Sequence, residues 1–307
     1  AEGARDNPPK AEGYRDVNAM EGTGNGAPAQ PLVVWEEYGA DGNKNAPIVN
    51  FSGNLPTGGG KGGKDGAMGG RSMPQEPGDA EPMSEQEAVQ AINRYMQILS
   101  KSEAGRAVVE MAEEMEIRFA VDQQAGVYGY YSPGENLVGI NPKMGDARAI
   151  ATLAHELRHA WQFKNGYHTK LEFSPADNIW MMRAMEADAE ANSLRVAAEL
   201  ADAGFPDVLQ SHAQSEYGDE AMAMVHMLQK DPAAIKNGKA QRAVFDQWFS
   251  KDWRRKAYDN HSINYLEHFA FVLDDNRKTK GFEKIETEWL EGLGTQPDGS
   301  SYLSHRD

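Results

Sequence analysis

The stretch Asp-Ala-Arg-Ala-Ile-Ala-Thr-Leu-Ala-His-Glu-Leu-Arg-His-Ala-Trp-Gln-Phe, residues 146–163, decides the fold and contains the pattern H-E-x-x-H. Its apolar residues recur at helical spacing, and Asp146 can cap the first turn, so the stretch predicts a helix. His155 and His159 are one turn apart, which directs both imidazoles to one side of that helix. Two neutral imidazoles at this separation can bind one Zn²⁺ ion. Glu156 follows His155, so its carboxylate is expected beside the metal, where a general base acting on water must lie.

The composition restricts the kinds of site and partner that the chain can have. Its 307 residues include eight histidines but no cysteine, so a metal site must use histidine and carboxylate ligands, and a disulfide-stapled fold is excluded. The formal net charge of −16 argues against nucleic acid as a partner. No apolar run reaches the length needed to span a bilayer, so we expect no membrane span. The sequence leaves the compartment open, with the cytoplasm slightly favoured over secretion.

The composition also divides the chain. Residues 1–83 contain 17 of the 31 glycines and 9 of the 15 prolines, a content typical of low-complexity sequence. We therefore expect a mostly disordered arm, in which residues 32–38 and 47–51 could form short strands that either add to an edge of the folded domain or contribute nothing. The folded domain is expected to span residues 84–292. Residues 293–307 are again rich in Gly, Pro and Ser, which predicts a flexible tail.

Hydrophobic periodicity predicts a mostly helical α+β fold. A capping box at Ser84 and Glu87 starts the first helix, and a strand is expected at residues 116–121. Residues 127–131 and 136–140, joined by Ser-Pro-Gly-Glu, predict a hairpin. We expect a small antiparallel sheet packed on the H-E-x-x-H helix, followed by a helical C-terminal half. The strand at 137–141 is a candidate edge strand that could hold an extended substrate, and an ordinary core strand is the alternative.

A catalytic zinc site usually has three protein ligands, so one more ligand is expected downstream of the two histidines. Glu186 is favoured, because it lies 27 residues beyond His159 on a predicted helix, residues 178–203, that can pack against the metal helix. Glu190 lies one turn later, where it could accept the outer N–H of a ligand histidine and orient the imidazole. Glu190 and His168 remain alternatives as the third ligand. A solvated acidic helix face is the alternative without a metal.

This pattern resembles a known class of enzymes. H-E-x-x-H followed by Glu186-x-x-x-Glu190 is similar to the zincin metallopeptidases of the gluzincin type, although that group more often has Asp at the position of Glu190. The runs His-Glu-Leu-Arg-His-Ala-Trp-Gln and Glu-Ala-Asp-Ala-Glu-Ala, with residues 231–249, resemble a family of bacterial metallopeptidase domains without an established function. The resemblance covers roughly residues 90–270. It implies a zincin-like fold and hydrolysis, but no particular substrate.

The expected function is that of a zinc metallopeptidase, with one Zn²⁺ per chain and a peptide or protein substrate. Glu156 would act as the general base on a water activated by the metal. A donor to the oxyanion is also needed, and His261 and Tyr258 are candidates, although each alone is more often structural. Two alternatives stay open, a hydrolase of a non-peptide amide and a non-catalytic binding or regulatory module. His212 and His226 carry no functional signal in the sequence.

Overall fold

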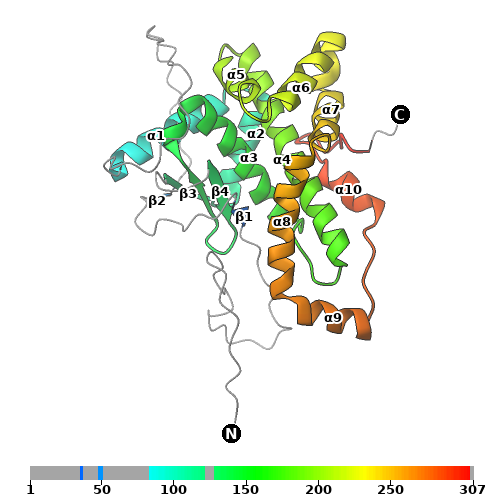
Figure 1. Ribbon diagram of the computed structural model, residues 1–307. Helices are drawn as coiled ribbons and strands as arrows, with labels where there is room; N and C mark the ends of the chain where they lie inside the picture. The colour runs from blue at the N-terminus through cyan, green and yellow to red at the C-terminus, as the bar shows by residue number, and fades with distance from the viewer. Residues whose placement is uncertain (1–34, 37–47, 51–82, 122–127, 305–307) are drawn as a thin grey trace.

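A computed structural model of the chain describes the backbone of residues 35–36 and 48–50 and the whole of residues 83–121 and 128–304 (Figure 1). The expected arm, residues 1–83, lies outside the described residues except for these two short strands and Met83. Most of the described chain is helical and one small sheet completes it, so the expectation of a mostly helical α+β fold is confirmed.

The first two helices begin where the sequence has hydroxyl caps. Helix α1 (Glu85–Leu99) starts at the Ser84–Glu87 capping box, in which each side chain bonds the backbone of the other, as predicted. The Ser102 side chain caps helix α2 (Glu103–Glu114) by accepting from the backbone N–H of Gly105. The apolar stripes of both helices are buried against the centre of the molecule.

The sheet has the order β1–β4–β5–β3–β2 and is mixed rather than antiparallel. Strands β4 (Gly129–Ser132) and β5 (Leu137–Ile140) form the predicted antiparallel hairpin. Strand β3 (Arg118–Val121) pairs with β5 in parallel, so the expectation of a purely antiparallel sheet is wrong. The cause is the strand order, because β3 joins the hairpin beside its second strand and not beside its first.

The two short arm strands extend the sheet at its edges. Strand β1 (Trp35–Glu36) pairs with β4, and strand β2 (Ile48–Asn50) pairs with β3, both antiparallel. Strand β5 is therefore central, and all four of its residues are buried. The prediction that residues 137–141 form a substrate-binding edge is wrong, and the alternative of a core strand holds. Gly139 suits this position because a Cβ there would meet the ring of Tyr130 at 2.3 Å.

Helix α3 (Asp146–Lys164) and helix α4 (Pro175–Asp202) form the centre of the molecule. Helix α3 packs against strands β4 and β5 and against α4 (Figure 1). Gly145, with φ of 84°, precedes α3, and no side chain caps the helix. The prediction that Asp146 caps this helix is wrong. Its carboxylate instead accepts two hydrogen bonds from Arg94 on α1, at 2.7 and 2.9 Å.

The C-terminal half is helical, as expected. It contains α5 (Asp207–Ala213), α6 (Gly218–Lys230), η3 (Pro232–Ile235), α7 (Lys239–Trp248), α8 (Asp252–His268), α9 (Ala270–Thr279) and α10 (Thr287–Leu293). A short 3-10 turn, η2 (Pro142–Met144), precedes α3. Among the described residues, no helix combines the length and apolar character that a membrane crossing requires.

The segment after α10 packs onto the core instead of forming the expected tail. Tyr302 is 1% exposed and Leu303 is 4% exposed. The Tyr302 hydroxyl donates to Asp188 Oδ1 on α4 at 2.7 Å. Arg158 Nη2 on α3 donates to the carbonyl oxygens of Leu293 and Thr295, at 2.7 and 3.1 Å. The prediction of a flexible tail from residue 293 therefore fails for the part described, up to residue 304.

Candidate metal centre

Three side chains from the two central helices converge on one point. His155 and His159 come from α3 and Glu186 from α4, and none is more than 5% exposed. The two Nε2 atoms are 3.0 Å apart. Glu186 Oε2 lies 3.6 Å from His155 Nε2, and Glu186 Oε1 lies 3.6 Å from His159 Nε2. The three residues form a group that could hold a metal ion.

The distances between these donor atoms fit a small tetrahedral ion. Metal–ligand bonds of about 2.0–2.1 Å at tetrahedral angles separate neighbouring ligands by about 3.3–3.4 Å. The observed separations of 3.0, 3.6 and 3.6 Å bracket that value. Glu186 Oε2 is moreover buried without a hydrogen-bond partner, a costly state for a carboxylate oxygen unless a cation faces it. The residues present therefore suit a metal ion.

The electrostatics keep the Glu186 carboxylate ionised. Burial by itself raises its pKa, but His159 and His155 outweigh burial and lower the pKa to about 2. Burial lowers the pKa of His159, but the charge of Glu186, its hydrogen bonding and the charge of Glu156 together outweigh burial, so the pKa of His159 is raised. An ionised carboxylate is the form in which Glu binds a metal.

The outer nitrogen of His159 is held by an amide. Gln162 donates its Nε2 hydrogens to the Met185 carbonyl and to Asp188 Oδ2, both at 2.8 Å. Its Oε1 therefore faces His159 Nδ1, at 2.8 Å, and must accept a hydrogen from that nitrogen. This assignment leaves the lone pair of His159 on Nε2, which is the nitrogen that points toward Glu186.

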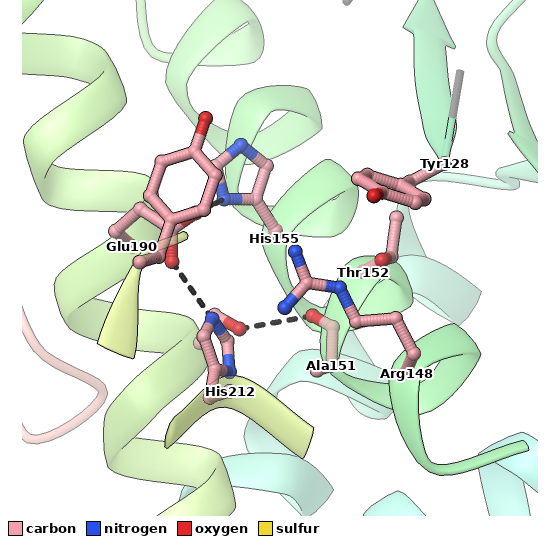
Figure 2. Close-up of a pocket in the computed structure, with 9 residues that line it drawn as sticks. Tyr128, Arg148, Ala151, Thr152, His155, Glu190 and His212 are labelled. Carbon is pink, nitrogen blue, oxygen red and sulfur yellow. Dashed lines mark hydrogen bonds and ion pairs between the residues drawn. The ribbon is translucent and has the colours of Figure 1, made fainter. Parts of the chain in front are cut away.

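The outer nitrogen of His155 faces Glu190, although their separation is longer than a usual N–H···O hydrogen bond. His155 Nδ1 lies 3.5 Å from Glu190 Oε1, and Glu190 Oε2 lies 3.0 Å from Nε2 of His212 (Figure 2). His212 comes from α5 and is 3% exposed. Sequence reasoning missed His212, because nothing near it in the chain indicates that α5 packs over α4. His212 therefore bonds the carboxylate that lies behind His155.

Glu156 is buried beside this group, where strand β4 approaches α3. A Cβ at Gly129 would meet Thr152 Cγ2 at 2.6 Å and Glu156 Cγ at 3.2 Å. Only glycine therefore lets the start of β4 come this close to the Glu156 side chain. The Glu156 charge also contributes to the raised pKa of His159. This position agrees with the expectation that Glu156 lies next to the metal group and not within it.

The comparison with protein families bears directly on this site. The family model described as "Putative metallopeptidase family (DUF6782)" matches residues 68–304. The chain belongs to this family. The match includes every residue of the candidate metal centre and supports a metallopeptidase, an enzyme class that requires a metal ion. The comparisons with curated proteins and with solved structures gave no match.

The two candidate oxyanion donors, His261 and Tyr258, have different surroundings. Both lie on α8, which packs against α4 and is fixed there by the Arg183–Asp259 ion pair, at 2.6 Å. Burial lowers the pKa of His261, and the charge of Glu186 acts against this shift. The ring of Tyr258 instead packs against Trp248, with 5.5 Å between centroids.

The alternative third ligands lie outside the metal group. His168 packs its ring against Phe163, and its Nδ1 lies 3.0 Å from the Thr169 carbonyl oxygen. Glu190 faces the outer nitrogen of His155 and not the space between the two Nε2 atoms. Among the candidates from the sequence, Glu186 is therefore the one that the structure brings to both histidines.

Proposed function

We propose that this protein is a zinc-dependent peptidase of zincin-like fold, with one Zn²⁺ held by His155, His159 and Glu186. The observation that carries the proposal is the convergence of three buried side chains, in which the two Nε2 atoms are 3.0 Å apart and each lies 3.6 Å from one oxygen of the Glu186 carboxylate. Gln162 orients His159 from behind, Glu190 lies behind His155, and both histidines present Nε2 to the same point. Family membership supports the same class of enzyme.

Zinc bound there would supply a Lewis acid that activates water and polarises the scissile carbonyl. Glu156, buried beside the group, takes a proton from the attacking water and passes it to the leaving amine. Its side chain lies against the start of β4, where Gly129 leaves room for it. His261 is the better candidate for the oxyanion donor, because it is close enough to Glu186 for their charges to interact, whereas Tyr258 packs onto Trp248.

The deciding experiment compares the zinc content of the purified wild-type protein with that of the Glu186→Ala variant. We expect about one zinc per chain in the wild type and a large loss in the variant, because two histidines alone are a weak site. Glu190→Ala is the matched control, since it removes an acid of the same helix and is expected to weaken zinc binding without abolishing it. A variant at Glu186 that keeps its zinc would refute the ligand set.

The activity is tested with the zinc-loaded protein and an unfolded protein substrate such as casein. Cleavage that a chelator stops and zinc restores would support a peptidase. Zinc binding with hydrolysis of simple amides alone would indicate the non-peptide hydrolase. Zinc binding with no hydrolysis of any amide would contradict the enzyme and favour the non-catalytic module.

A further inference from the structure

A small pocket lies behind the metal centre, against the face of His155 that carries Nδ1. Helix α3 contributes Arg148, Thr152 and His155 to its wall. Glu190, His212 and Tyr128 also line the pocket (Figure 2). The pocket has room for about one water-sized group. One oxygen of a carboxylate therefore fits this space. The pocket and the metal group share His155 as a common wall.

Arg148 is the cation of this pocket and has no bonded partner among the described residues. Its guanidinium extends into the pocket in Figure 2 and lies over the ring of Tyr128, with 5.0 Å to the centroid. Its Nη1 is buried and makes no hydrogen bond. Elsewhere in the described chain, the buried guanidinium groups of Arg158 and Arg254 each contact a carboxylate at 2.8 Å or less.

The nearest acid does not bond to this guanidinium. The positive charge of Arg148 contributes to lowering the pKa of Glu190, so the two groups interact through space. The oxygens of Glu190, however, face His155 Nδ1 at 3.5 Å and His212 Nε2 at 3.0 Å. Arg148 therefore keeps donor hydrogens for another acceptor. A guanidinium presents these hydrogens as a planar fork that matches a carboxylate.

We propose that this pocket binds a carboxylate of the substrate and that Arg148 selects it. The inference rests on the proposed peptidase function and names its substrate class, peptides with a carboxylate close to the scissile bond. Arg148 and His155 are seven residues apart, about 10 Å along α3, and the arginine side chain covers part of that distance. An extended peptide advances about 3.4 Å per residue, so the carboxylate lies within about two residues of the bond that is cut.

The carboxylate can come from an Asp or Glu side chain or from the C-terminus of the peptide, and the experiment separates these sources. The zinc-loaded full chain is incubated with a mixed peptide library, and the cleaved bonds are identified by mass spectrometry. Matched peptides are then compared in kcat/KM, with Glu against Gln at the selected position and a free C-terminal acid against its amide. We expect the carboxylate form of one pair to be cleaved about 10-fold to 100-fold faster, the usual effect of a charge-assisted bond.

Variants at Arg148 show whether this residue causes the preference. Arg148→Gln should bring the ratio within the selected pair to about 1, and Arg148→Glu should favour Lys over Glu at that position. Arg148→Lys keeps the charge and should retain part of the ratio, and it replaces the Gln variant where the latter does not fold. Arg94→Gln is the matched control, because Arg94 pairs with Asp146 at the start of the same helix but outside the pocket, and it should keep the ratio.

Equal cleavage of both members of every pair by the wild type would overturn this inference and leave the peptidase intact. A ratio that survives in Arg148→Gln would also overturn it, because the preference would then come from another group. If the zinc-loaded protein cleaves no peptide of the set, the proposed function fails and the inference fails with it.

Discussion

Replacing His212 with Ala tests whether the contacts from α5 through Glu190 support His155 as a metal ligand. The substitution removes the 3.0 Å bond to Glu190 Oε2 and leaves only the 3.5 Å contact between Glu190 and His155. Loss of such an outer-shell partner typically costs about 10-fold to 100-fold in metal affinity, or about 1.4–2.8 kcal/mol. Glu190 is 6% exposed, so its carboxylate stays buried with one bond fewer. We therefore also expect the metal-free protein to lose about 1–3 kcal/mol of unfolding free energy.

Zinc affinity is measured by competition with a chelator of known affinity, and stability by urea unfolding of the metal-free protein. His226→Ala is the matched control, because His226 is exposed on α6 and should change neither quantity. His212→Gln keeps an N–H donor and should recover part of the affinity. Zinc binding by His212→Ala within about 2-fold of the wild type would refute the reasoning, because the lost donor would then have no effect on His155.

Three further substitutions test other parts of the site. Glu156→Gln should keep its zinc while peptide hydrolysis falls about 10²-fold to 10⁴-fold, and full activity would exclude this residue as the base. Asp188→Asn removes a fully buried charge that accepts bonds from several side chains, so urea unfolding should show that the unfolding free energy falls by about 3–5 kcal/mol. Asp246 lies in an exposed ion pair, so Asp246→Asn should lower the unfolding free energy by about 1 kcal/mol or less. His261→Ala should lower kcat more than Tyr258→Phe does, with zinc content unchanged in both, and the reverse order of kcat would assign the donor to Tyr258.

The metal group could be predicted from the sequence because local geometry determines most of it. A helix fixes the separation of residues four apart, so the convergence of His155 and His159 follows once the helix is recognised. Glu186 and Glu190 also have a helical separation, and one turn is enough to place one at the metal group and the other behind His155. The capping box before α1 is a local signal of the same kind, and it too was correct.

Features that depend on packing between distant segments could not be predicted. The residues of β5 are apolar on both faces, which suggests burial but does not say which strands lie on either side. Arg148 and His212 become neighbours only because α5 packs against α3 and α4. The prediction for the segment after residue 293 was wrong for another reason. Its Gly, Pro and Ser content indicates backbone freedom, but two large buried side chains, Tyr302 and Leu303, attach it to the core.

The two ligand histidines depend on different parts of the chain for their orientation. His155 is held through Glu190 by His212 on α5, and His159 is held through Gln162 by Asp188. Asp188 in turn accepts hydrogens from Arg158 and Tyr302, and so connects to the segment after α10. Helices α3 and α4 supply the candidate ligands, and α5 and the C-terminal segment add bonds behind them. Because such outer partners strengthen metal binding, we expect the metal affinity to depend on the folding of α5 and of the C-terminal segment.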